Sequence, residues 1–414
     1  MRSRHFGPKC ALCAAALLAL AGGSPGQAAD EQDFAQIEHG RYMVAAADCA
    51  ACHTNLPNGA GFAGGRAIQT PFGMVASSNI TPDKESGIGR WTDAEFEAAV
   101  REGKRPDGSH LYPAMPYPYY RKMTHADVLA MRAYLQTVPP VHNLVESNRL
   151  PFPFDIRASV GVWNAMYFSD EPFKADPRRS AEWNRGAYLV QGPGHCAACH
   201  TAKTILGGDH RDRAYQGYSL QGWFAPNLTD DNALGLGEWS QADIVAYLKG
   251  GHNRIAAASG PMAEVVADGS SQLQESDLRA IATYLKSEQS RSEVSPPVAA
   301  DDPAMQAGAA IYQDVCSACH QLKGTGVPYL IPDLASASSV SSREPTSIIR
   351  VLLHGTQSVA TAAEPTGASM PAFGRQLTDA QIAAVATFIR NSWGHAAAAV
   401  TESDVHKARK DSKS

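Results

Sequence analysis

The sequence is short of cysteine, and none of its cysteines is left over for a disulfide framework. Of the eight cysteines, Cys10 and Cys13 lie near the N-terminus, and the other six occur as three C-x-x-C-H motifs. We therefore predict no disulfides. Long apolar runs are missing as well. The apolar run from Cys10 to Ala21 is shorter than the roughly 20 residues that a membrane-spanning helix needs.

An excess of positive charge is also absent, which disfavours nucleic-acid binding. The formal net charge is −5. Residues 1–28 have the pattern of a secretory signal peptide, with basic Arg2, Arg4 and Lys9, a short apolar core, and small residues at 26–28. Loss of these three positive charges on cleavage moves the formal net charge to −8. The C-x-x-C spacing of Cys10 and Cys13 inside this segment is incidental, because no His follows it.

The three C-x-x-C-H motifs carry the chemistry of the chain. They are Cys49-Ala50-Ala51-Cys52-His53, Cys196-Ala197-Ala198-Cys199-His200 and Cys316-Ser317-Ala318-Cys319-His320. This motif is typical of c-type haem attachment. Two thiols three residues apart share one side of a helical turn, so both can form thioethers to one porphyrin edge. The next residue, His, is then placed as the proximal iron ligand. A single copy could be chance or half of a zinc site, but three copies predict three covalent haem c groups.

The motifs belong to units that repeat along the chain. A short helical pattern precedes each motif, and a second one follows it at a distance. Each of the later patterns starts with Ser or Thr before Asp, which is an N-terminal helix signal. We predict an all-α fold of three tandem class I cytochrome c domains, each wrapped on its haem. The predicted segments are a signal peptide (1–28), domain 1 (30–141), an apolar linker that packs on the domains (142–180), domain 2 (181–288), a linker (289–303), domain 3 (304–394) and a charged, frayed tail (395–414).

A haem that only carries electrons usually has a second protein ligand, and His with Met raises the reduction potential. One Met in each unit stands in a Gly/Pro-rich stretch before the last helix: Met115, Met262 and Met370. We predict that these stretches are loops and that these residues are the sixth ligands. His110, His252 and His354 precede them and are the alternatives. Met43 and Met131 fall on helical patterns and are predicted to be core residues. His195, in a tight turn, is predicted to pack or hydrogen-bond rather than to ligate.

With these motifs, the chain resembles the three-haem cytochrome c subunits of bacterial membrane-bound dehydrogenases, such as those for gluconate, alcohol, sorbitol, fructose and aldehyde. The segments that carry this resemblance most specifically are residues 111–118, 192–201, 225–229 and 260–266. The resemblance implies an electron-transfer subunit without catalytic activity of its own. It implies a flavin- or quinone-dependent catalytic partner, with room for a small third subunit, and ubiquinone as acceptor. It also implies a periplasmic location, peripheral on the inner membrane.

Two other functions remain open from the sequence. A multihaem peroxidase needs one haem with an open sixth position, and the third unit, with its shorter His-to-Met span, is where such a haem would lie. A free periplasmic electron carrier needs the same haems but no fixed partner. The sequence contains no nucleophile or acid–base constellation outside the haem motifs, which favours the electron-transfer subunit.

Overall fold

The computed structural model describes residues 25–55 and 59–411. The predicted signal peptide therefore lies mostly outside the described residues. Its last four residues belong to the first helix, α1 (Pro25–Ala46). No helix in the described part of the chain is both long enough and apolar enough to cross a membrane.

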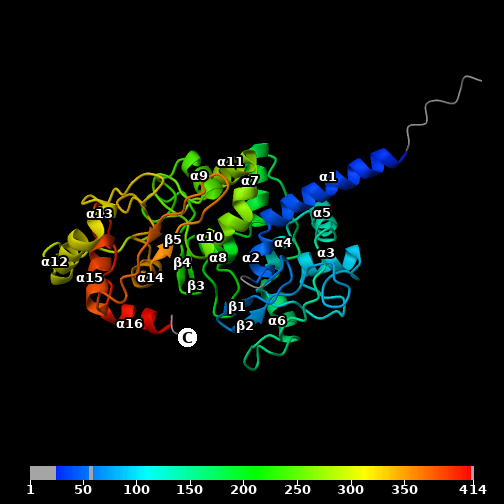
Figure 1. The fold of residues 1–414 in the computed structure, drawn as a ribbon, viewed down its shortest axis with the longest axis horizontal. Helices are drawn as coiled ribbons and strands as arrows, with labels where there is room; N and C mark the ends of the chain where they lie inside the picture. Colours follow the sequence, from blue (N-terminus) through cyan, green and yellow to red (C-terminus); the bar gives the residue numbers. More distant parts are fainter. Residues whose placement is uncertain (1–24, 56–58, 412–414) are drawn as a thin grey trace, which may run out of the picture.

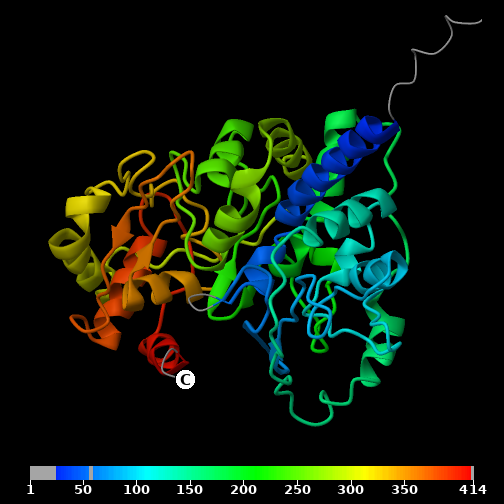
Figure 2. The same ribbon diagram turned by 45° about the vertical axis from the view of Figure 1, so that its right-hand side comes forward.

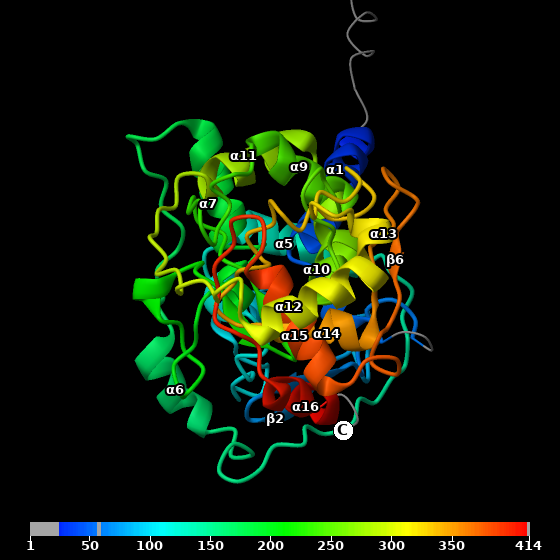
Figure 3. The same ribbon diagram turned by 90° about the vertical axis from the view of Figure 1, so that its left-hand side faces the viewer.

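The molecule consists of three helical units in a row, with the second unit between the other two (Figures 1 and 2). Figure 3 looks onto the third unit from its outer end. The helices of the first unit are α1, α2 (Cys49–His53), α3 (Asp93–Glu102), α4 (Tyr117–Tyr120) and α5 (His125–Leu135). Those of the second are α7 (Ala181–Gln191), α8 (Ala197–His200), α9 (Gln241–Gly250), α10 (Pro261–Glu264) and α11 (Glu275–Leu285). Those of the third are α12 (Pro303–Ile311), α13 (Ser317–His320), α14 (Thr346–His354) and α15 (Asp379–Arg390).

In every unit the first and last helices cross in close contact, and a glycine makes the crossing possible. A Cβ on Gly40, Gly186 or Gly308 would overlap the carbonyl oxygen of Ala130, Ala280 or Ala384 on the last helix of the same unit. Only a residue without a side chain lets two backbones approach so closely. Met43 and Met131, the predicted core methionines of the first unit, are buried at this crossing, which confirms that prediction.

The predicted caps are present at two of the three last helices. Thr124 accepts a hydrogen bond from the Asp127 N–H at the start of α5, and Thr378 forms a reciprocal capping box with Gln381 at the start of α15. The prediction for the second unit is wrong, because α11 begins at Glu275 and Ser276 lies inside its first turn. The cap residue is Gln274, whose N–H donates to the hydroxyl of Tyr42 in the first unit.

The fold is largely helical, but it also contains three short antiparallel hairpins that the all-α prediction omitted. They pair β1 (Ala67–Thr70) with β2 (Gly73–Ala76), β3 (Tyr218–Leu220) with β4 (Trp223–Ala225), and β5 (Thr356–Gln357) with β6 (Ser369–Met370). A Gly with positive φ (Gly73 or Gly222) lies at the turn of each of the first two hairpins. In both of these units the hairpin lies between the C-x-x-C-H helix and the next long helix.

The apolar segment 142–180 contacts both the first and the second unit. It forms α6 (Ser159–Tyr167), whose Asn164 accepts a hydrogen bond from Tyr117 and whose Trp163 donates to the Leu206 carbonyl. Residues 289–299, in contrast, have no regular structure and are mostly exposed.

The tail is not the frayed end that the sequence predicted. Residues Glu402–Asp411 form α16, which packs on α14 and α15. Val405 is fully buried there, and the Arg409 guanidinium donates to Asp379 at 2.7 Å. Ala408 also packs against the core of the third unit, and Arg409 donates to the carbonyls of Gly374 and Leu377 as well. These contacts of the inner face fix a helix that is otherwise mostly charged.

The buried apolar side chains form two cores rather than three. The first is continuous through units one and two, and the second belongs to unit three. Ile255, from the second unit, is fully buried in the second core. The first two units are therefore packed as one body. The third unit contacts it through the loop that carries Ile255 and through strand β4, whose Phe224 N–H donates to the Ser347 hydroxyl of α14 at 2.9 Å.

Candidate haem sites

Each C-x-x-C-H motif contains a short helical turn that ends at the motif histidine. The turns are α2, which holds the whole first motif, α8, for which Cys196 is the N-cap residue, and α13, which directly follows a π-helical turn that ends at Cys316. None of the six motif cysteines is paired in the part of the chain that the structure describes. The two thiols of each motif therefore remain available for two thioether bonds, as c-type haem attachment requires.

All three motif histidines are held in the same way. The Nδ1 of His53 lies 2.7 Å from the Ser78 carbonyl oxygen, that of His200 2.6 Å from Pro226, and that of His320 3.3 Å from Pro332. A carbonyl oxygen only accepts, so Nδ1 carries the proton and donates it. Nε2 is then unprotonated and free to bind a metal. Each motif histidine thus uses its second ring nitrogen to donate to a backbone carbonyl.

A short side-chain turn holds each acceptor carbonyl in place. Asn79 and Asn227, directly after Ser78 and Pro226, each accept from the backbone N–H and the hydroxyl of a threonine two residues on. Asp333, after Pro332, accepts from the Ala335 N–H. The recurrence of Asn-x-Thr in the first two units was the sequence signal for this turn, although sequence reasoning did not link it to the histidines.

Burial keeps the histidines neutral. Removal from water lowers the pKa of His53 and His320 and lowers that of His200 to about 4. Burial also raises the pKa of the Cys52 thiol to about 11 and that of the Cys196 thiol to about 12. Each site therefore presents an uncharged imidazole, the form that binds iron. The first two histidines are buried, whereas His320 is half-buried and Cys319 is exposed.

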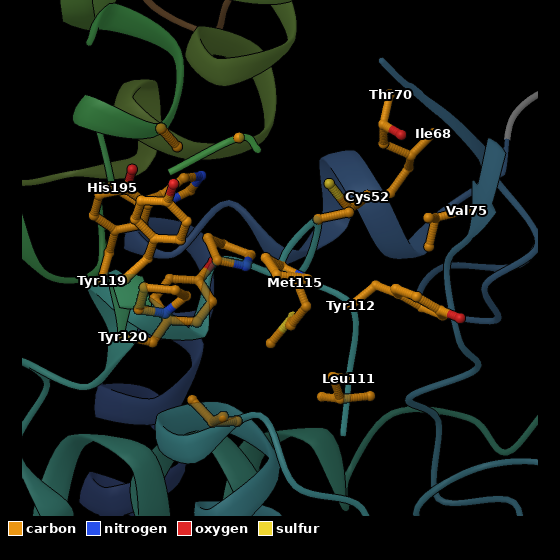
Figure 4. Close-up of a pocket in the computed structure, with 18 of the residues that line it drawn as sticks. Cys52, Ile68, Thr70, Val75, Leu111, Tyr112, Met115, Tyr119, Tyr120 and His195 are labelled. Carbon is orange, nitrogen blue, oxygen red and sulfur yellow. The ribbon is translucent and has the colours of Figure 1, made fainter. Parts of the chain in front are cut away.

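One large cavity contains the predicted ligands of the first site. Its volume is about 2150 Å³, and Cys49, Cys52, His53 and Met115 all line it. Cys199 of the second motif lines the same cavity. Figure 4 shows Met115 in the middle, with Cys52 on one side and Tyr119, Tyr120 and His195 on the other. Pockets for single ligands are roughly 300–1,000 Å³. The volume, the apolar lining and the donor set thus fit a haem at the first motif. Of the second motif, Cys199 lines the cavity, whereas Cys196 and His200 do not.

The structure places the other two predicted methionine ligands differently from the sequence expectation. Met115 is in a loop, as predicted, but Met262 lies in the first turn of α10 and Met370 in strand β6. Pro261 at the start of α10 and the pairing of Met370 with Thr356 explain these local structures. Met370 packs against the core that contains Cys316. Met262 does not line the large cavity.

The remaining histidines have distinct surroundings. His195 is partly buried, donates through Nδ1 to the Pro193 carbonyl at 2.8 Å, and packs its ring edge-on against Tyr120 with centroids 5.5 Å apart. This agrees with the predicted packing role. His110 lies 3.4 Å from the Asn164 amide, and His354 is exposed. His252 is buried, and neither of its ring nitrogens has a hydrogen-bond partner among the described residues.

The sequence is similar to one protein family and to several characterised proteins. The family model for cytochrome c matches this chain three times, over residues 37–139, 184–289 and 305–393. The chain is 39% identical to the cytochrome c subunit of the quinone-type alcohol dehydrogenase of Gluconacetobacter polyoxogenes, over 97% of this chain and 90% of that protein. It is 37% identical to the fructose dehydrogenase cytochrome subunit of Gluconobacter japonicus, over 98% and 90%. It is also 38% identical to the gluconate 2-dehydrogenase cytochrome c subunit of Pantoea cypripedii, over 92% and 91%.

Three matches to one family model account for the three units, and the relatives are matched over nearly their whole length. The repeated attachment turn, the oriented histidine and the glycine at the helix crossing are the structural counterparts of these matches. The chain belongs to the cytochrome c family, in the group that contains the cytochrome c subunits of alcohol, fructose and gluconate dehydrogenases.

Proposed function

We propose that this chain is the electron-transfer subunit of a dehydrogenase complex and carries three covalently attached haem c groups. The observation that carries the proposal is the threefold histidine geometry. Each C-x-x-C-H histidine donates Nδ1–H to a backbone carbonyl, so its Nε2 is oriented for iron. A bound haem supplies one-electron chemistry by cycling its iron between two oxidation states.

The residues that hold each haem follow from this arrangement. Cys49 and Cys52, Cys196 and Cys199, and Cys316 and Cys319 form the thioethers, and His53, His200 and His320 are the proximal ligands. Met115, Met262 and Met370 are the sixth ligands, of which Met115 is the best supported because it lines the same cavity as His53. A thioether ligand is neutral and soft, so it favours the reduced iron. A haem held by a histidine and a methionine would carry electrons without binding a substrate at its iron, which suits an electron-transfer subunit.

The partner is a catalytic subunit that oxidises an alcohol, sugar, sugar acid or aldehyde with a flavin or quinone cofactor. A small third subunit fits the same assembly. This part of the proposal is supported by the relatives, whose names place them in alcohol, fructose and gluconate dehydrogenases. Electrons enter this chain from that subunit and leave to ubiquinone.

The proposed location is the periplasm, with the protein peripheral on the inner membrane. The signal-peptide pattern of residues 1–28 supports export. Export also suits the cofactor, because c-type haem is attached outside the cytoplasm. Attachment to the membrane then runs through partner subunits or surface contact.

The test is to purify the protein from native membranes under mild conditions and identify what accompanies it. We expect a dehydrogenase subunit, and we expect its substrate to reduce the haems of this chain, as followed by the haem absorption bands. Purification without any dehydrogenase would contradict the subunit role and indicate a free carrier. Peroxide turnover with cyanide binding by one whole haem equivalent would instead indicate a peroxidase.

A further inference from the structure

The first and second units are joined by two equivalent sets of polar contacts. In the first set, which we call the Asp127 clasp, Asp127 accepts a hydrogen bond from His39 of its own unit at 2.6 Å. It accepts a second one from the hydroxyl of Tyr188 in the second unit. In the second set, the Asp277 clasp, Asp277 accepts two hydrogen bonds from Arg185 of its own unit, at 2.9 and 2.6 Å. It accepts a third from the hydroxyl of Tyr42 in the first unit at 2.6 Å.

The residues of the two clasps occupy equivalent positions in their units. His39 and Arg185 directly precede the crossing glycines Gly40 and Gly186, and Tyr42 and Tyr188 follow those glycines by two residues. Asp127 and Asp277 each stand three residues after the cap of the last helix. A twofold rotation that places the first unit on the second therefore also places one clasp on the other, as in the isologous interface of a twofold dimer.

Each tyrosine hydroxyl makes a second contact that follows the same symmetry. Tyr188 accepts from the N–H of Thr124, the cap residue of α5, at 3.1 Å, and Tyr42 accepts from the N–H of Gln274, the cap residue of α11, at 3.2 Å. Each unit thus satisfies an amide at the N-terminus of the other unit's last helix. Loss of one hydroxyl would leave both an amide and a carboxylate short of a partner.

The third unit lacks every side chain of the clasp. The equivalent positions hold Ala307, Ala310 and Gln381, and all three residues are exposed. The separate core of the third unit agrees with this difference, whereas the first two units share one core. The clasp is thus a property of the first pair of units only.

The clasped pair brings the first two haem motifs to one cavity. Cys52 and Cys199 both line it. Residues that follow Met115 reach across to the second motif: the Tyr120 ring packs on His195, and Tyr119 donates to Asp209 at 2.7 Å. Lys203 donates to the carbonyl of Ala197 at 2.9 Å and also contacts Asp209. Through these contacts, the segment that carries Met115 at the first site packs directly against residues next to the second motif.

We propose that the first two units form a pseudo-twofold pair, and that Tyr42, Tyr188, Asp127 and Asp277 are positioning residues that set the separation of the first two haems for direct electron transfer. The inference rests on the proposed haem attachment at these sites. It adds that the clasps act together with the shared core and the linker 142–180 to fix this separation, and that they do not act on the third haem.

The test uses the full chain with its haems attached. Intact mass and haem content are measured first, since fewer than three haems would contradict the proposed function rather than this inference. Distances between the three oxidised haems are then measured by pulsed electron double resonance, and electron equilibration by rapid photoreduction. We expect one distance to be clearly shorter than the other two.

In the double variant Tyr42→Phe/Tyr188→Phe, we expect the short distance to broaden and lengthen, and electron equilibration within the pair to slow several-fold at unchanged reduction potentials. Tyr329→Phe, an exposed tyrosine of the third unit, is the matched control and should change neither. If the double variant folds poorly, Asp277→Asn, which keeps the side-chain size, should broaden the short distance to a smaller extent. An unchanged short distance and rate in a folded variant, or three similar distances in the wild type, would overturn the proposal.

Discussion

Replacing the crossing glycine of the second unit with alanine should destabilise that unit through the close approach of α7 and α11. A Cβ on Gly186 would lie 2.5 Å from the Ala280 carbonyl carbon and 2.9 Å from Tyr284 Cβ, and closer still to the Ala280 oxygen. Both helices must then move apart along a buried contact. Overpacking costs roughly 1–3 kcal/mol, and a clash with backbone belongs at the upper end. The higher helix propensity of alanine over glycine offsets up to about 1 kcal/mol of this loss. The net loss should be about 2 kcal/mol.

Calorimetric unfolding of the haem-loaded chain measures this loss. For a folding unit of about 250 residues, which is the size of the first two units with their shared core, 1 kcal/mol shifts the Tm by roughly 2–4 °C, so their common transition should fall by about 4–8 °C. Gly161→Ala is the matched control: Gly161 is also helical, but its Cβ would meet nothing closer than 3.5 Å. The control should gain up to about 1 kcal/mol from propensity. Equal stabilisation by both substitutions would refute the close crossing.

Five further substitutions test other parts of the structure. Met115→Leu, Met262→Leu and Met370→Leu, made singly, should each lower the reduction potential of one haem in a redox titration, because leucine offers no sixth ligand; an unchanged titration rejects that ligand. Burial alone would raise the pKa of Asp277, but hydrogen bonds from Arg185 and Tyr42 bring it below its ordinary value. The stability that this carboxylate contributes is thus present above about pH 4 and lost as the pH falls further. Asp277→Asn should therefore lower the denaturation midpoint at pH 7 and flatten its acid dependence; parallel pH curves would argue against this. Arg390 is buried and donates to the Val340 carbonyl. Since hydrogen bonds of charged groups contribute roughly 1.5–3 kcal/mol, Arg390→Ala should cost about 2 kcal/mol in urea unfolding, and an undiminished midpoint would contradict the contact.

The attachment motifs could be predicted from sequence because their chemistry is local. Two thiols and an imidazole within five residues need only one helical turn, and that turn is present three times. The long helices were also predictable, since apolar periodicity and caps act within a few residues. The loops expected around Met262 and Met370 are absent for two different reasons. Pro261 is a local signal that starts a short helix, and Met370 pairs with Thr356, which lies outside its local sequence.

The contacts between units could not be predicted, because they join residues far apart in the chain. Tyr42 and Asp277 are 235 positions apart, and no periodicity links them. The tail illustrates the same limit, since its charged sequence predicts a solvated end unless the ion pair of Arg409 with Asp379 is known. The carbonyl groups that accept from the motif histidines were predictable only in part. Their Asn-x-Thr turns recur in the sequence, but only the structure connects them to the motif histidines.

The central claim is that each of the three motifs carries a covalent haem. Peptide-resolved mass spectrometry of the protein isolated from its native host tests it most directly. The account predicts three haem-bearing peptides, containing Cys49 and Cys52, Cys196 and Cys199, and Cys316 and Cys319, and an intact mass with three haems added. A motif recovered with free thiols, or fewer than three haems on the intact chain, would contradict it.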